Sequence, residues 1–155
     1  MKIDLLLLGK TKDDYLQLGI DEYVKRLSRY NPVNVIEIKT PRHGSRPEAE
    51  ILQQESSLLE KRIRNGSCRV VLDSQGRQYS SESFARFISS LESQAVSTVS
   101  FIIGGPLGLA DEQRRKADHL LSLSNMTYTH DMSRLILLEQ LYRAYTIKAG
   151  TGYHK

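Results

Sequence analysis

Cysteine is scarce in this chain of 155 residues, and the scarcity limits the chemistry that thiols can supply. The single cysteine, Cys68, can form neither an internal disulfide nor a multi-cysteine zinc site. The four histidines have no metal-ligand spacing, so we expect no metal site. A lone thiol fits a reducing compartment, and we therefore expect a cytoplasmic protein.

Long apolar runs are also lacking. The longest aliphatic runs cover residues 5–8 and 135–138, whereas a membrane-spanning helix needs about 20 consecutive apolar residues. No small-residue cleavage site follows the apolar N-terminal stretch, so we expect no signal peptide. These features predict that the protein does not enter a membrane.

Neither acidic nor basic residues are in large excess. The 22 Lys and Arg residues exceed the 18 Asp and Glu residues, giving a net charge of +4. Such a balance permits an anionic partner such as nucleic acid but hardly favours one. Hydrophobic residues make up 39% and charged residues 26%, as in a soluble globular protein. We find no repeat or linker and expect one domain over residues 1–155.

The hydrophobic periodicity alternates between strand and helix patterns. A T-x-x-D helix start at Thr11 and a capping box over residues 45–48 favour two of the helices. The alternation predicts an α/β fold with a mostly parallel sheet flanked by helices. The expected strands are 2–8, 33–38, 69–72, 99–103 and 120–124. Four helices are expected to begin near residues 11, 45, 111 and 133, and a further helix is marked by Phe84, Phe87, Ile88 and Leu91.

Two glycine-bearing loops follow expected strands, at residues 73–78 and 104–108. Ligands of parallel α/β sheets bind at the carboxyl ends of strands. Gly104 and Gly105 would let a ligand approach the backbone, and Pro106 would stiffen the turn. The segment matches neither the Walker loop nor the G-x-G-x-x-G fingerprint. A tight turn without a ligand is equally compatible with it.

Other polar segments are ambiguous on local grounds. Residues 122–128 alternate small polar and apolar side chains, which suits a ligand-binding loop but suits an ordinary edge strand better. Arg143 stands on an apolar helix, where it needs either a carboxylate such as Glu139 or an anionic ligand; the ion pair is favoured. Residues 114–116 indicate a solvated basic helix face, and no Ser–His–Asp arrangement is defensible.

Four segments occur together in a characteristic order: Ile-Ile-Gly-Gly-Pro-Leu-Gly at 102–108, Ser-Leu-Ser at 122–124, Glu-Gln-Leu-Tyr-Arg-Ala at 139–144, and a terminal Tyr153-His154. With the hydrophobic strand before Gly9-Lys10-Thr11-Lys12, they resemble the ribosomal RNA large subunit methyltransferase H family, a group of SPOUT-class enzymes. The resemblance extends over residues 1–155.

The resemblance implies a C-terminal trefoil knot that binds S-adenosyl-L-methionine. It also implies a homodimer in which the partner chain completes each site. The expected reaction is methylation of N3 of a pseudouridine in 23S rRNA on the assembled ribosome. Arg143, Tyr153 and His154 would line the substrate side and carry catalysis. The cofactor would lie among Leu72, Gly104, Gly105, Leu123, Ser124, Asn125, Met126, Thr127 and Tyr128.

Two other functions fit the same residues. One is a knotted methyltransferase that acts on tRNA, which would share the cofactor pocket. The other is a non-catalytic α/β module that binds a nucleotide or ribosomal RNA and needs no sulfonium pocket. In each case basic side chains would contact phosphates. The candidates for such contacts are Lys10, Lys12, Arg42, His43, Arg46 and Lys148.

Overall fold

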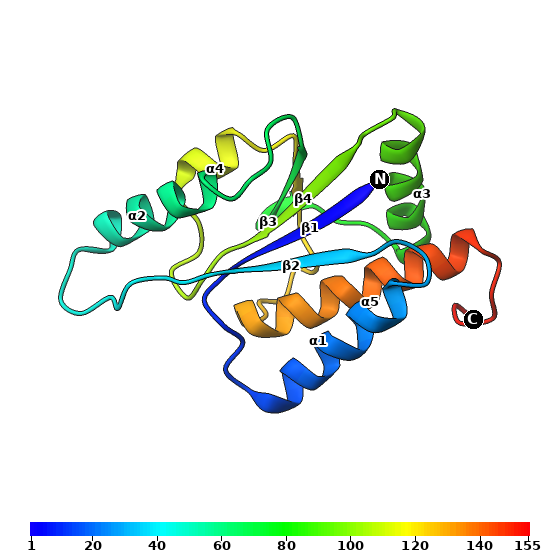
Figure 1. Cartoon of the computed structure of the whole chain (residues 1–155), viewed down its shortest axis with the longest axis horizontal. Coiled ribbons are helices and arrows are strands. Elements are labelled where there is room, and N and C mark those ends of the chain that lie inside the picture. The colour runs from blue at the N-terminus through cyan, green and yellow to red at the C-terminus, as the bar shows by residue number, and fades with distance from the viewer.

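The computed structural model describes residues 1–155 and contains one five-stranded sheet in the order β2-β1-β4-β3-β5 (Figure 1). All four strand pairings are parallel, as the alternating pattern predicts. The strands are β1 (Lys2–Leu8), β2 (Val33–Ile38), β3 (Cys68–Arg77), β4 (Thr98–Ile103) and β5 (His119–Leu121). The helices are α1 (Asp14–Leu27), α2 (Glu48–Glu60), α3 (Ser81–Ser93), α4 (Asp111–Arg115) and α5 (His130–Lys148).

Helices cover both faces of the sheet, so the central strands are apolar on both sides. In β1, Leu5 points toward the core beneath α1, α3 and α5, whereas Leu6 belongs to the smaller core beneath α2. A parallel strand that is covered on both faces reads as a continuous hydrophobic run, and residues 5–8 have that form.

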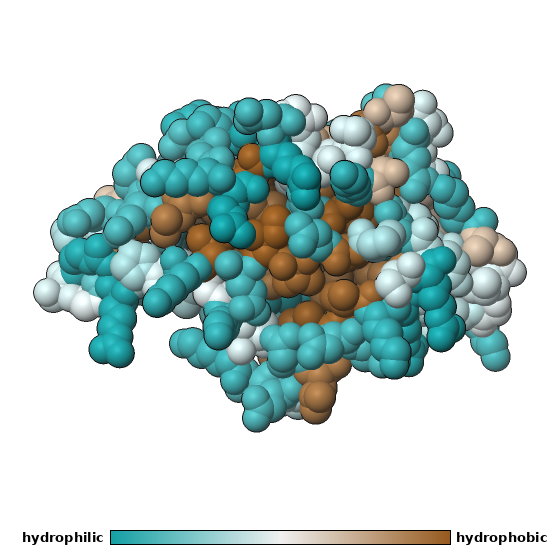
Figure 2. Space-filling view, in the orientation of Figure 1, coloured by the Kyte–Doolittle hydropathy of each residue, from teal (hydrophilic) through white to brown (hydrophobic).

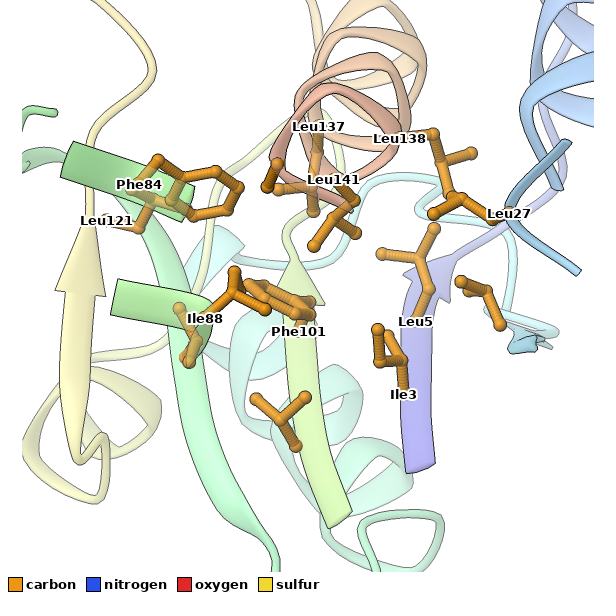
Figure 3. Packing of buried hydrophobic residues seen from close by; sticks show 14 of the residues in the cluster. Ile3, Leu5, Leu27, Phe84, Ile88, Phe101, Leu121, Leu137, Leu138 and Leu141 are labelled. Atoms are coloured by element: carbon orange, nitrogen blue, oxygen red, sulfur yellow. The ribbon is translucent and has the colours of Figure 1, made fainter. Parts of the chain in front are cut away.

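The larger core lies between the sheet and α5. Figure 3 shows Leu137, Leu138 and Leu141 of α5 above Leu5 and Phe101 of the sheet. All five side chains are fully buried. Figure 2 shows hydrophobic side chains across the middle of the visible face, over the sheet between α2 and α5, with hydrophilic residues around them. No helix combines the length and the apolarity that crossing a bilayer demands.

Two expected helix starts are wrong. Helix α1 begins at Asp14, and neither Thr11 nor Asp13 caps it through its side chain. The Thr11 hydroxyl instead accepts a hydrogen bond of 2.9 Å from Arg134 of α5. Helix α2 begins at Glu48 behind Pro47, and no capping box forms at Ser45. Tertiary contacts therefore determine how both of these chain segments enter their helices.

Strand β3 is longer than expected and crosses close to β5. It continues past Leu72 to Arg77, whose carbonyl accepts a hydrogen bond of 3.0 Å from the Ser122 amide. A Cβ added at Gly76 would lie 2.6 Å from backbone atoms of Leu120 and Leu121. The crossing thus requires glycine at position 76, and it holds segment 73–77 against β5 at the edge where the glycine-rich loop also lies.

Candidate active site

A cavity of about 540 Å³ opens at the carboxyl ends of β3, β4 and β5. Three chain segments supply most of its wall: residues 72–74, 103–109 and 121–130. The strand-end rule for parallel sheets predicts a ligand site at this edge. The volume and the mixture of apolar side chains with a few polar groups are those of a small-molecule pocket.

The glycine-rich loop after β4 folds tightly on itself. The Gly108 amide donates to the Gly105 carbonyl at 2.9 Å, and Gly108 has a φ of +80°. A Cβ at Gly104 would lie 2.6 Å from the Gly108 carbonyl oxygen. Glycine is therefore needed at 104 for the loop to close, and the closed loop presents backbone to the cavity.

The loop between β5 and α5 is shaped by its serines. The Ser124 hydroxyl accepts from the Met126 amide at 2.9 Å, and the Ser122 hydroxyl donates to the Ser124 carbonyl at 3.1 Å. The amides of Leu123, Thr127 and Tyr128 donate to no backbone carbonyl. These groups are free to serve a ligand, because an unpaired backbone amide needs a partner when water is displaced.

An ion pair joins two elements at the rim of the cavity. Asp73, just after Leu72, accepts hydrogen bonds from Arg114 Nε of α4 at 2.5 Å and from the Gln75 amide at 2.8 Å. Partial burial raises the pKa of Asp73, but these two hydrogen bonds together outweigh burial and hold the pKa of Asp73 below its usual value. Both side chains line the cavity. Residues 114–116 are all exposed, as predicted, and Arg114 in addition pairs with Asp73 at the rim of the cavity.

The first turn of α5 closes the remaining side. The Thr129 hydroxyl caps this helix by accepting from the Met132 amide at 3.2 Å. Thr129, His130 and Ser133 all line the cavity. Burial lowers the pKa of His130, which favours its neutral form. This wall therefore adds little positive charge near neutral pH.

Most residues predicted to hold the cofactor meet at this one cavity. Asn125 lies outside the lining, and its side-chain oxygen accepts from Gln78 Nε2 at 2.6 Å. The eight that line it are Leu72, Gly104, Gly105, Leu123, Ser124, Met126, Thr127 and Tyr128.

Sequence reasoning assigned no ligand role to Asp73, Arg114 or His130, although it placed the loop that contains the first of them at a strand end. The first could have been found because it directly follows the apolar run of β3. His130 could have been considered in the same way, because it is the first residue of α5.

The three predicted catalytic residues form a second cluster at the other end of α5. Arg143 pairs with Glu139, as expected, and its guanidinium lies 4.8 Å from the centre of the Tyr153 ring. The His154 ring bridges Arg143 Nη1, at 3.4 Å from Nδ1, and Glu82 Oε1, at 3.0 Å from Nε2. One neutral tautomer, with its proton on Nε2, satisfies both contacts.

Tyr153 is bound at the centre of this C-terminal cluster. Its hydroxyl donates to Glu139 Oε1 at 3.1 Å and lies 3.2 Å from the hydroxyl of Tyr23. Burial, followed by these two hydrogen bonds, raises the pKa of Tyr153. The phenol therefore stays protonated at neutral pH, whereas the His154 Nδ1 atom faces Arg143 Nη1.

The cavity and the C-terminal cluster are separate within one chain. Ser133 lines the cavity, and Arg143 stands about 15 Å further along the axis of α5, at 1.5 Å per residue. The structure does not bring the predicted catalytic residues to the predicted cofactor residues of the same chain.

The fold agrees with comparisons to known proteins. The model of the family described as "Predicted SPOUT methyltransferase" matches residues 1–154, so the chain belongs to the SPOUT methyltransferase family. That membership gives the α/β fold its C-terminal trefoil knot. General topology rules do not predict such a knot.

Relatives of similar length make the resemblance more specific. The chain is 45% identical to ribosomal RNA large subunit methyltransferase H of Halothermothrix orenii over 159 residues, and 45% identical to that of Desulfotalea psychrophila over 155 residues. The protein of the same name from Streptococcus uberis is 42% identical. Each alignment covers 100% of both chains. The resemblance to this family is therefore confirmed.

A solved structure supports the fold alone. A probable methylase family protein from Haemophilus influenzae Rd KW20 superimposes with a TM-score of 0.54 at 11% identity. The alignment covers 99% of this chain and 70% of that one.

Proposed function

We propose that this protein transfers the methyl group of S-adenosyl-L-methionine to N3 of a pseudouridine in 23S rRNA on the assembled ribosome. One observation carries the proposal: three chain segments, at Leu72, Gly104 and Ser124, line a single open cavity at the carboxyl edge of the sheet. The names of the full-length relatives support large-subunit rRNA as the substrate.

The cavity suits an adenosyl group with a cationic sulfonium. Apolar side chains such as Leu72, Leu109 and Leu121 offer a slot for the adenine ring. The free amides of Leu123, Thr127 and Tyr128 can recognise its edge. A neutral His130 and an ionised Asp73 make the walls tolerant of positive charge. When bound, the cofactor supplies an already activated methyl group, so the protein's main task is alignment.

The C-terminal cluster suits the substrate side. The acceptor N3 carries a proton that must leave, and a general base must reach it. Of the two candidates, His154 is better suited than Tyr153, because the raised pKa of Tyr153 keeps its phenol protonated. Arg143 can hold a phosphate or a base carbonyl when its guanidinium is shared between Glu139 and the substrate. In this arrangement His154 is the proton acceptor, and Arg143 and Tyr153 are positioning residues beside it.

A homodimer would bring the C-terminal cluster of one chain to the cavity of its partner. The separation along α5 within one chain supports this arrangement. Exposed apolar side chains support it as well, since such groups mark interaction surfaces. Tyr15 and Leu18 of α1 are 66% and 70% exposed, and Met126 in the wall loop is 74% exposed. An isologous two-fold contact is the commonest way to cover such a patch.

The proposal is tested by mass spectrometry of ribosomal RNA from cells that lack the gene and from cells that re-express it. We expect one N3-methylated pseudouridine of 23S rRNA to disappear and return. Change confined to tRNA would favour a tRNA methyltransferase instead.

A thermal-shift titration with S-adenosylhomocysteine separates enzyme from binding module. Ligand at about one hundred times its dissociation constant adds roughly 2.7 kcal/mol of stability. The absence of any shift would favour the non-catalytic module.

A further inference from the structure

Two loops at the carboxyl ends of β1 and β2 carry positive charge that no carboxylate neutralises. Residues 9–12 and 39–46 contain no Asp or Glu. Lys10, Lys12, Lys39 and Arg42 are exposed, and none lies in an ion pair. We refer to these four residues as the basic ridge.

Three cations that lie near the cavity or in the C-terminal cluster are paired. Arg114 and Arg143 are bound to Asp73 and Glu139. Lys148, a sequence-based candidate for phosphate contact, pairs with Glu92. An exposed cation that already has a carboxylate partner gains less from a phosphate than a free one. The ridge therefore retains an attraction for an anionic polymer that these paired cations do not offer.

Each loop of the ridge is tied to a different wall of the cavity. The Lys12 amide donates to Asp131 Oδ2 of α5 at 3.1 Å, and the adjacent His130 lines the cavity. In the second loop, His43 Nε2 lies 3.4 Å from Oε1 of the buried Glu55. That same oxygen would lie 3.9 Å from a Cβ at Gly105 in the glycine-rich wall. Both loops thus have fixed positions relative to the cavity.

The second loop is also braced from within. Arg46 donates from Nη2 to the Arg42 carbonyl at 2.6 Å and from Nη1 to Gln54 of α2 at 2.7 Å. Figure 1 shows this loop projecting from the end of the molecule where α5 begins, and Figure 2 shows hydrophilic side chains there. A braced, protruding cationic loop presents its charge with little ordering cost on binding.

We infer that the basic ridge is the surface on which the phosphate backbone of the substrate RNA docks, beside the cavity that holds the methyl donor. This inference rests on the proposed function and adds the location of the RNA backbone to it. The contact is electrostatic and independent of sequence, so it supplies affinity and orientation, while the cavity and the C-terminal cluster select the base.

The test compares two quadruple variants with the same loss of charge. The ridge variant carries Lys10→Gln, Lys12→Gln, Lys39→Gln and Arg42→Gln. The control carries Lys25→Gln, Arg29→Gln, Lys61→Gln and Arg62→Gln. These four exposed cations have no salt-bridge partner and lie in or beside the turns that precede β2 and β3, at the opposite edge of the sheet. Binding to ribosomes from cells lacking the gene is measured between 50 and 200 mM KCl, with KM and kcat for methylation.

We expect the ridge variant to bind ribosomes at least about tenfold more weakly at the lowest salt. We also expect the slope of log K against log salt to fall by roughly one for each lost phosphate contact. The control should stay within about threefold of the wild type, because only its long-range attraction is reduced. The thermal shift with S-adenosylhomocysteine should be unchanged in both.

Equal weakening of the two variants would overturn the inference, since net charge alone would then explain binding. Unchanged binding by the ridge variant, or loss of its thermal shift, would overturn it as well. These outcomes differ from failure of the proposed function, in which the wild type itself neither responds to S-adenosylhomocysteine nor methylates ribosomes.

Discussion

The fully buried guanidinium of Arg134 donates from Nη2 to the carbonyl oxygen of Leu8, 2.9 Å away, and so joins α5 to the last residue of β1. Its Nη1 donates to the Thr11 hydroxyl and lies 3.1 Å from Asp131, which is also buried. Because His130 and Ser133 on the same turn line the cavity, this pair fixes one cavity wall relative to the loop after β1.

Replacing Arg134 by methionine should destabilise the protein strongly. The substitution leaves Asp131 buried without its cation, and breaking a buried ion pair in this way costs about 3–5 kcal/mol. Urea unfolding measures the loss. Arg115→Met on the exposed side of α4 is the matched control and should cost less than about 0.5 kcal/mol.

Adding Asp131→Leu to Arg134→Met should recover part of that stability, since no unpaired charge then remains buried. An Arg134→Met protein as stable as the wild type would show that the pair contributes little.

Gly76→Ala should also destabilise, for a different reason. The added methyl group would lie 2.6 Å from the backbone of Leu120 and Leu121, which cannot rotate away as a side chain can. Forcing extra volume into such a contact costs roughly 1–3 kcal/mol. Gly152→Ala is the control, because no atom lies within 4 Å of its added Cβ. Equal thermal unfolding temperatures for the two variants would contradict the role of Gly76 in the crossing.

The order of strands and helices could be predicted because it depends on local hydrophobic period. Strand β3 ends too early in the prediction because residues 73–77 are polar, and only their pairing with β5 makes them extended. Gly104 and Gly105 were recognisable since they follow a strand, whereas the serine segment at 122–124 favoured an edge strand on local grounds and only the family resemblance implied a cofactor role for it. The ion pair of Arg114 was not predicted because Asp73, its partner, is distant in the sequence.

The helix starts show the same limit. A T-x-x-D pattern predicts that Thr11 caps its own helix, yet the hydroxyl accepts from Arg134, more than a hundred residues later. The cost of leaving a buried guanidinium unsatisfied exceeds the value of a cap, so the tertiary partner prevails. Likewise, the distance between Arg143 and the cavity follows from the length of α5, which no motif encodes.

The lowered pKa of His130 predicts a pH dependence of stability. Below the usual histidine pKa of about 6.5, the unfolded chain binds a proton that the folded chain resists. Stability should therefore fall as the pH drops from about 7 toward the lowered folded pKa and rise again on return to neutral pH. Urea midpoints at pH 7 and pH 5.5 measure this change.

The His130→Gln variant supplies the comparison, since it removes the titrating group. We expect its midpoint to vary less with pH than that of the wild type. A matched change at the exposed His119, His119→Gln, should leave the wild-type dependence in place. If His130→Gln retained the full dependence, another group would be responsible.

Removing residues 153–155 should abolish methylation and leave cofactor binding intact. The tail supplies Tyr153 and His154 to the C-terminal cluster but does not line the cavity of its own chain. We expect no detectable turnover and an unchanged thermal shift with S-adenosylhomocysteine. Lys155→Gln is the control for the loss of terminal charge and should retain activity. Normal turnover by the truncated chain would refute a role for the tail.

Two inactive chains should restore activity when they share a dimer. One chain lacks residues 153–155 but keeps its cavity; the other keeps its tail but carries Gly104→Ala, whose methyl group would lie 2.6 Å from the Gly108 carbonyl oxygen. If the partner completes each site, the mixed dimer has one cavity facing an intact tail and regains roughly half of the wild-type turnover. Co-expression with two affinity tags isolates this species. A mixed dimer as inactive as both parents would place the tail and the cavity of one chain in the same site.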